Sequence, residues 1–126
     1  MLSQETSFEV VPCPVSGRAL RAGAGNDTFI GFIGADTING GAGTNTLTLT
    51  ATSSDLNSAL DAQLTLVRSV SAASATAGVL IDLSAQTEGF TLTGSAFADT
   101  LTGSLGADSI SAGNGNNQIY GFVGAD

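Results

Sequence analysis

The chain has 126 residues, of which 42% are hydrophobic and 11% are charged, and its net charge is −8 because only three Arg offset eleven acidic residues. This charge disfavours nucleic acids and anionic membrane surfaces as partners and favours cations, and no apolar run reaches the roughly 18 residues of a membrane span. Since the chain has no His, and its single Cys13 therefore lacks a catalytic base, the composition also argues against an enzyme.

Nine-residue repeats dominate the chain on both sides of its middle. After residues 1–16, which we expect to be poorly ordered, a first repeat block spans residues 17–48 and contains AGAGNDTFI, GFIGADTIN and GGAGTNTLT. A second block spans residues 94–126 and contains GSAFADTLT, GSLGADSIS, AGNGNNQIY and the partial repeat GFVGAD. The sixth residue is always Asp or Asn, and the eighth, where present, is apolar. The Gly-rich first six residues predict a turn, and the alternating last three predict a short strand.

The segment between the two blocks, residues 49–93, is less regular. A longer strand is predicted over residues 46–52, and leucines at helical spacing predict a short helix over residues 54–64 with Ser54 as its N-cap. Further strands are predicted at residues 64–67, 79–83 and 90–92, and a loop rich in Ser and Ala at residues 69–77. Leu83 and Leu92 keep the register of the eighth position, so we expect the repeat architecture to continue through this segment.

Three-residue strands need neighbours, because strands this short are not stable alone. Two consecutive repeats therefore predict one coil of a flattened solenoid, in which each repeat stacks on the repeat after next and the eighth residues form an inner ladder. Stacked strands lie about 4.8 Å apart, so stacked sixth-position carboxylates repel one another unless a cation lies between them. Calcium suits such a site because it binds several oxygen ligands, whereas a chain without His and with one Cys does not suit zinc or copper.

This stacking pairs Asp27 with Asn45, Asp99 with Asn117 and Asp108 with Asp126. The first two pairs carry one charge each, which weakens calcium binding. Phe97 replaces the fourth-position Gly of its repeat and is expected to impair that turn. Arg18 occupies a sixth position two repeats before Asp36, and two interpretations remain open: it pairs with Asp36 in place of a metal, or it is a solvated surface side chain.

The repeats resemble the nonapeptide G-G-x-G-x-D-x-U-x of RTX, or hemolysin-type calcium-binding, proteins over residues 22–48 and 94–126. The resemblance implies an all-β, right-handed parallel β-roll or β-helix solenoid, with Ca2+ held between adjacent turns by the sixth-position side chain and by backbone carbonyls. No repeat combines Gly at positions one, two and four with Asp at six, so we expect weak affinity. The candidate calcium ligands are Asp27, Asp36, Asn45, Asp99, Asp108, Asn117 and Asp126, with Gly23, Gly25, Gly41, Gly43, Gly106 and Gly124.

The resemblance further implies a calcium-binding structural module of a secreted or cell-surface bacterial protein, exported through a one-step channel and stabilised by extracellular calcium. Residues 78–96 resemble the spacers between repeat blocks of large surface proteins of this kind, and because the sequence stops inside a repeat we expect a larger parent protein as its main partner. One alternative is an accessory domain of a secreted protease or lipase. Another is an ice- or surface-binding solenoid, which ranks last because its outward Thr pairs do not form a continuous face.

Overall fold

The computed structural model describes residues 10–12, 19–32 and 36–121, and in this part of the chain it is a parallel β-solenoid of about 6 turns. The predicted all-β solenoid with a short helix in its middle is confirmed. The strands are β1 (Val10–Pro12), β2 (Ala19–Arg21), β3 (Thr28–Ile30), β4 (Thr37–Asn39), β5 (Thr46–Thr48), β6 (Leu64–Thr65), β7 (Ser69–Ser71), β8 (Leu80–Asp82), β9 (Thr91–Thr93), β10 (Thr100–Thr102), β11 (Ser109–Ser111) and β12 (Gln118–Tyr120).

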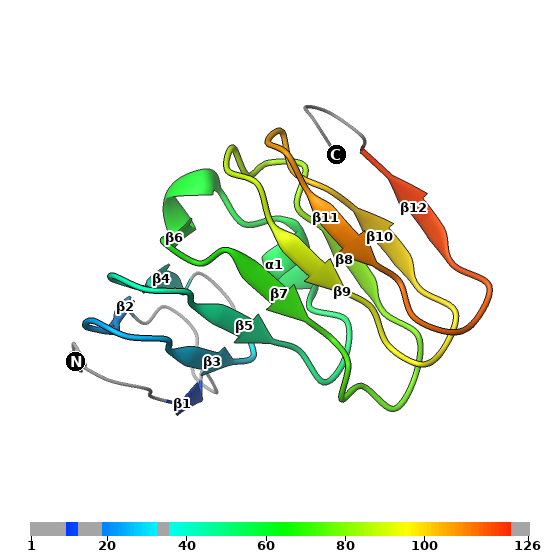
Figure 1. Cartoon of the computed structure of the whole chain (residues 1–126), viewed down its shortest axis with the longest axis horizontal. Coiled ribbons are helices and arrows are strands. Elements are labelled where there is room, and N and C mark those ends of the chain that lie inside the picture. The colour runs from blue at the N-terminus through cyan, green and yellow to red at the C-terminus, as the bar shows by residue number, and fades with distance from the viewer. Residues whose placement is uncertain (1–9, 13–18, 33–35, 122–126) are drawn as a thin grey trace.

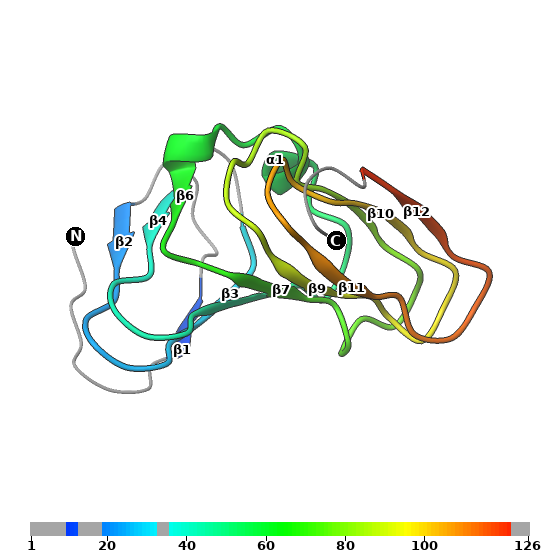
Figure 2. The same cartoon turned by 45° about the horizontal axis from the view of Figure 1, so that its top comes forward.

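Successive strands alternate between two faces of the solenoid. One face is a continuous six-stranded sheet in the order β1-β3-β5-β7-β9-β11, which crosses the molecule in Figure 1. The other face is divided into a sheet β2-β4-β6 and a sheet β12-β10-β8. The view in Figure 2 shows the two faces joined by turns at their edges. Each coil therefore contributes one strand to the continuous face and one to the divided face.

The register confirms the stacking expected within the two repeat blocks. Thr28 pairs with Thr46, Ala19 with Thr37, Thr91 with Ser109, and Thr100 with Gln118, so each repeat lies on the repeat after next. The central apolar residue of each strand consequently lies on the central apolar residue of its neighbour.

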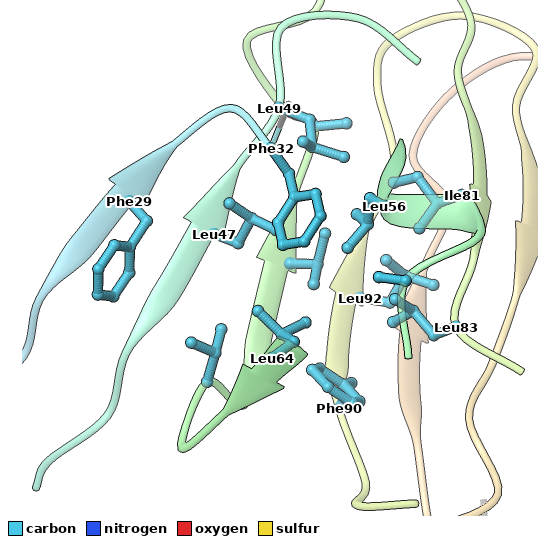
Figure 3. Close-up of a cluster of buried hydrophobic side chains, with 14 of the residues drawn as sticks. Phe29, Phe32, Leu47, Leu49, Leu56, Leu64, Ile81, Leu83, Phe90 and Leu92 are labelled. Carbon is cyan, nitrogen blue, oxygen red and sulfur yellow. The ribbon is translucent and has the colours of Figure 1, made fainter. Parts of the chain in front are cut away.

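The core is a ladder of these central residues, widened by apolar residues that follow the strands. Figure 3 shows Phe29, Leu47 and Leu92 from the continuous face together with Leu64 and Ile81 from the divided face. The relative exposure of all five side chains is 0%. Because one large side chain per strand fills the interior, truncating a ladder Leu to Ala should cost about 2–5 kcal/mol of stability.

The predicted helix over residues 54–64 is wrong beyond its first turn. The α-helix is α1 (Ser54–Asn57), and a separate 3-10 turn, η1 (Asp61–Gln63), follows it. The N-cap is Ser53 and not Ser54, because the Ser53 hydroxyl accepts a hydrogen bond from the Leu56 N–H at 3.1 Å. Leu60 has an extended backbone and is 68% exposed, so it does not continue the apolar helical face.

Several strand predictions in the middle segment also need correction. The predicted loop over residues 69–77 begins with β7, whose central Val70 is fully buried between the half-buried Ser69 and Ser71. The strand predicted over residues 46–52 ends at Thr48, and the one predicted over residues 64–67 ends at Thr65. Leu83 does not hold the eighth-position register, because Ile81 is the residue that pairs with Leu101. In each case the neighbouring coil, and not the local pattern, sets where pairing starts and stops.

Helix α1 covers the break in the divided face. The Asn57 Nδ2 donates to the Leu80 carbonyl at 3.1 Å, and the Asp82 N–H donates to the Asn57 Oδ1 at 2.8 Å. Leu56 points into the core beside Ile81 and Leu83 (Figure 3). The inserted segment therefore keeps the core closed where β6 and β8 do not pair.

Candidate metal sites in the turns

The sixth-position side chains lie inside the turns and not on the surface. Asp27, Asp36 and Asn45 are at most 1% exposed, Asp99 is 2% exposed and Asp108 is 7% exposed. Asn117 is partly buried near the end of the described chain. A buried carboxylate or amide must be satisfied by hydrogen bonds or by a cation, so the partners of each side chain decide what the turn can bind.

Each sixth-position side chain with a described partner reaches back to the preceding coil. The Asn45 Oδ1 accepts the Asp27 N–H at 2.9 Å, and the Asn117 Oδ1 accepts the Asp99 N–H at 2.9 Å. The Asp99 Oδ1 accepts the Val79 N–H, and the Asp108 Oδ1 accepts the Phe90 N–H, both at 2.8 Å. The pairs Asp27/Asn45 and Asp99/Asn117 are thus brought together as the sequence predicts, through one side chain and one backbone N–H.

The sixth-position carboxylates of the described chain each stack on a residue that is not acidic. Asp27 stacks on Asn45, and Asp99 lies between Val79 and Asn117 of the two neighbouring coils. Asp108 stacks on Phe90 of the preceding coil. No two sixth-position carboxylates stack directly on each other among the described residues. The pair Asp108/Asp126 and the pair Arg18/Asp36 involve residues outside the described ranges, as does Gly124.

Turns with Asn at the sixth position share one conformation. In the turn before β5, Gly41 and Gly43 have positive φ, at 71° and 100°, and in the turn before β12 Gly113 and Gly115 have φ of 76° and 98°. The amide group completes the turn, because the Asn45 Nδ2 donates to the Gly41 carbonyl at 3.3 Å and the Asn117 Nδ2 donates to the Gly113 carbonyl at 3.2 Å.

Turns with Ser at the second position and Asp at the sixth are built differently. Ser95 donates its N–H to the Asp99 Oδ2 at 2.7 Å and its hydroxyl to the Asp99 Oδ1 at 2.7 Å. Ser104 makes the same two bonds to Asp108, at 2.7 and 2.8 Å. Residues 94–108, all of them described, contain no positive φ.

The turn that contains Phe97 is formed. The expectation that Phe97 impairs this turn is therefore wrong. The Phe97 N–H donates to the Ser95 Oγ at 3.0 Å, as the Gly106 N–H does to the Ser104 Oγ at 3.1 Å. Because φ stays negative, a bulky residue fits at the fourth position, and the Phe97 side chain is 45% exposed. The signal missed in the sequence is the Ser two residues before Phe97 and four before Asp99.

The turns before β3 and β5 fit a hard cation. Gly41 and Gly43 lie so close to the Gly23 and Gly25 carbonyl oxygens that a Cβ on either would overlap them. The turns are held together because the Gly25 N–H donates to the Ala42 carbonyl at 3.1 Å. The donor set consists of backbone oxygens and the buried Asp27 carboxylate, and oxygen ligands of this kind are those that calcium prefers.

The Ser/Asp turns do not fit calcium equally well. Each carboxylate already accepts three hydrogen bonds, two from one Ser and one from the preceding coil. Gly94 and Gly103 pack directly against the Asp99 and Asp108 Oδ2 atoms. A cation would have to displace these donors.

Other features of the described chain add no further metal cluster. Among the described residues no group of three or more Asp, Glu, Cys or His side chains is placed to hold a metal ion. No helix in the described ranges is long and apolar enough to cross a membrane.

The predicted site residue Asp36 lies in the turn before β4. Its carbonyl accepts a hydrogen bond from the Gln63 Nε2 at 3.1 Å, which links this turn to η1.

The comparisons with known proteins agree with this geometry. The family model of the RTX calcium-binding nonapeptide repeat matches residues 19–47 and 91–126 with 4 copies, just over half of the chain. No curated protein and no solved structure matches the chain. The matched residues carry the stacked turns before β3, β5, β10, β11 and β12. The chain therefore belongs to the family of RTX calcium-binding nonapeptide repeats.

Proposed function

We propose that the turn at residues 22–27 and the turn stacked on it at residues 40–45 bind Ca2+, and that this binding stabilises the solenoid. The observation that carries the proposal is the close approach of Gly41 and Gly43 to the Gly23 and Gly25 carbonyls, which belong to the same turn as the buried Asp27. Family membership supports calcium as the cation.

The residues of this cradle have distinct roles. The Asp27 carboxylate and the carbonyls of Gly23 and Gly25 would hold the ion, while Asn45 positions the Asp27 backbone through its 2.9 Å hydrogen bond. A bound calcium ion would supply positive charge against a carboxylate and carbonyl dipoles that burial removes from water. With one carboxylate in the cradle, we expect affinity in the weak, extracellular part of the calcium range.

Calcium would act by mass action on folding. A chain with a net charge of −8 repels itself when compact, and its 17 Gly lose much conformational freedom on folding. A ligand that binds only the folded state offsets these costs by an amount that grows with the logarithm of its concentration above its Kd. The N-terminal coils would be loosely folded at intracellular calcium levels and compact at extracellular ones.

A calcium titration of the Asp27→Asn variant tests this function. We expect the wild-type melting temperature to rise with millimolar CaCl2 and isothermal calorimetry to detect binding, whereas Asp27→Asn should lose most of both responses. The control is Asp82→Asn, because Asp82 lies on β8, away from the cradle, and its Oδ1 accepts the Ser84 N–H at 2.9 Å. Equal calcium responses in Asp27→Asn and wild type would refute the proposed site.

We also propose that the module belongs to a larger secreted or cell-surface bacterial protein. The support is the family, whose repeats are typical of secreted bacterial proteins. The parent could be a surface protein, or a secreted protease or lipase that uses these coils as an accessory domain. Detecting the full protein in the culture supernatant, on the cell surface or only in the cytoplasm decides between export and its absence.

A second candidate function, binding to a regular surface such as ice, is favoured by one observation. Strand β7 bridges β5 and β9, so hydroxyl residues form two nearly continuous rows across the continuous face. We call this the hydroxyl face, and its flanking residues are Thr28, Ile30, Thr46, Thr48, Ser69, Ser71, Thr91, Thr93, Ser109 and Ser111. The rows repeat at the strand spacing of about 4.8 Å.

An ice-recrystallisation assay tests the second candidate. Inhibition by the wild type that Thr48→Lys and Thr93→Lys abolish would support the hydroxyl face. Thr102→Lys, on β10 of the divided face, serves as the matched control. Failure of the wild type to inhibit recrystallisation excludes ice as the surface.

A further inference from the structure

We infer that the turns at residues 94–99 and 103–108 are held without calcium, because Ser95 and Ser104 supply the donors that their sixth-position carboxylates need. Calcium dependence would then be confined to turns in which Asp at the sixth position follows Gly at the second. This goes beyond the proposed function, since it concerns the C-terminal coils and stands on their contacts alone.

The Asp99 carboxylate is satisfied by three donors. Its Oδ1 accepts the Val79 N–H at 2.8 Å and the Ser95 hydroxyl at 2.7 Å, and its Oδ2 accepts the Ser95 N–H at 2.7 Å. Hydrogen bonds to an ionised acceptor are roughly twice as strong as neutral ones. They offset the cost of burying a carboxylate that is 2% exposed.

The same arrangement recurs one repeat later. Asp108 accepts the Phe90 N–H at 2.8 Å, the Ser104 hydroxyl at 2.8 Å and the Ser104 N–H at 2.7 Å. Ser95 and Ser104 are themselves buried, at 3% and 1% exposure. Two independent turns with matching partners and distances indicate a defined structural unit, which we call the Ser–Asp turn.

The carboxylate oxygens of a Ser–Asp turn are engaged on several sides. The Asp99 Oδ2 lies against the Cα of Gly94, and the Asp108 Oδ2 lies against the Cα of Gly103, where even a Cβ would overlap. The Ser hydroxyl is also engaged from its other side, since Ser95 Oγ accepts the Phe97 N–H. A cation would have to break these bonds before it could bind.

The second and sixth positions together decide which donors satisfy the side chain at the sixth position. An Asn at the sixth position carries its own donor, which Asn45 and Asn117 use on the carbonyls of Gly41 and Gly113. An Asp carries none and needs a donor, which Ser95 supplies to Asp99. Gly23 is the second residue of the repeat that contains Asp27 and has no hydroxyl, so a Ser–Asp turn cannot form there.

Amide hydrogen exchange of the full chain, measured by NMR in EGTA and in CaCl2, tests this inference. We expect the amides of Ser95, Ser104 and Phe90 to keep the same protection in both conditions, within about threefold, a change below the worth of one hydrogen bond. A loss of their protection in EGTA, whether local or through unfolding of the whole chain, overturns the inference.

The same spectra separate this inference from the proposed function. The amides of Asp27 and Thr44, which donate to Asn45 and Asn26 in the N-terminal cradle, should gain protection with calcium. If they do not respond while Ser95 and Ser104 stay protected, the proposed calcium site fails and the Ser–Asp turn stands. If the two Ser amides respond to calcium, the inference fails whatever the cradle does.

A gain of calcium dependence provides a second test. Ser95→Gly recreates the Gly–Asp pattern of residues 22–27, so we expect Asp99 and its neighbours to lose protection about tenfold or more in EGTA, the worth of about one lost hydrogen bond, and to regain part of it in calcium. Ser84→Gly, at an exposed turn, is the matched control. Unchanged protection in Ser95→Gly without calcium overturns the inference.

Discussion

Asn45 joins three consecutive coils through a single side chain. Its Oδ1 accepts the Asp27 N–H from the coil before, while its Nδ2 donates to the Gly41 carbonyl in its own turn and to the Leu66 carbonyl in the coil after, at 2.9 Å. Leu66 presents this carbonyl from a left-handed backbone with φ of 56°, a conformation that costs an L-residue about 1–2 kcal/mol.

Leu66→Asn should relieve part of this strain. Asn adopts the left-handed region more readily than Leu, and the Leu66 side chain is 45% exposed, so we expect stabilisation by about 0.5–1 kcal/mol. Urea denaturation measures the gain. Leu60→Asn is the control, since Leu60 is exposed with φ of −73°, and it should change stability by less than about 0.5 kcal/mol. An equal effect of the two substitutions would contradict the role of backbone strain.

Asp61 links η1 to the turn before β9 and gives the chain a pH-dependent contact. Its Oδ1 accepts the Thr87 N–H at 2.9 Å, and this bond, ahead of the side-chain bonds to Glu88 and Thr87, lowers the pKa of Asp61 below 3.8. A pKa that is lower in the folded state stabilises the fold above pH 3.8, and the stabilisation disappears as the pH falls through the folded-state pKa.

An NMR titration of the Asp61 carboxyl carbon should therefore give a midpoint below 3.8 in the folded chain. Thr87→Pro removes the backbone N–H that is the main cause of the shift, and it should move the midpoint upwards. A folded-state midpoint at or above the ordinary value would show that the hydrogen bond does not persist in solution.

At the scale of elements, α1 bonds the edge of β8 that no strand pairs with in the described chain. Asn57 presents one donor and one acceptor to β8, at the Leu80 carbonyl and the Asp82 N–H, much as a peptide group of a paired strand would. The Thr52 hydroxyl adds a third bond by accepting the Leu80 N–H at 2.9 Å. The edge of β8 is thereby satisfied although no strand pairs with it on that side within the described chain.

Asn57→Ala should expose that edge and destabilise the fold. The variant loses both hydrogen bonds and leaves their partners to water, so we expect a loss of about 1–2 kcal/mol in urea denaturation. Asn116→Ala, at an exposed position in the last described turn, should cost less than about 0.5 kcal/mol. Equal losses would mean that α1 packs on β8 through Leu56 alone.

The elements that the sequence predicts well are those whose information is local. Glycine, the sixth-position Asp or Asn and the eighth-position apolar residue occur within one repeat, and they suffice for the turns, the stacking and the inner ladder. Strand β7 is different, because Ser69 and Ser71 flank a single Val70 in a segment rich in Ser and Ala. Its pairing with β5 and β9 decides that it is a strand, and that information lies in distant residues.

The sequence predicts the candidate sites less completely than the fold. Position and burial of Asp27, Asp99 and Asp108 follow from the repeat, but what satisfies each carboxylate depends on the second residue of the same repeat. The Ser at positions 95 and 104 was visible in the sequence, yet its role needs the turn geometry, in which the second and sixth residues meet.

At the scale of the whole molecule, the solenoid is a one-dimensional stack in which each coil contacts only its neighbours. Stability in such stacks is approximately the sum of the coils and their interfaces, so different parts can unfold separately. The N-terminal coils carry the Gly–Asp cradle at Asp27, whereas the C-terminal coils carry the Ser–Asp turns at Asp99 and Asp108. Calcium should therefore act on one end of the stack more than on the other.

Differential scanning calorimetry should resolve this asymmetry. In EGTA we expect a broadened or double transition, with a calorimetric enthalpy larger than the van't Hoff enthalpy, because the N-terminal coils melt first. Millimolar CaCl2 should raise the first transition towards the second, whereas NaCl or MgCl2 of matched ionic strength should shift both slightly by screening the net charge of −8. A single transition in EGTA that calcium moves as a whole would mean that the ion stabilises all coils alike. An ion bound only between the turns at residues 22–27 and 40–45 can stabilise the last coils only indirectly, through every coil interface between them.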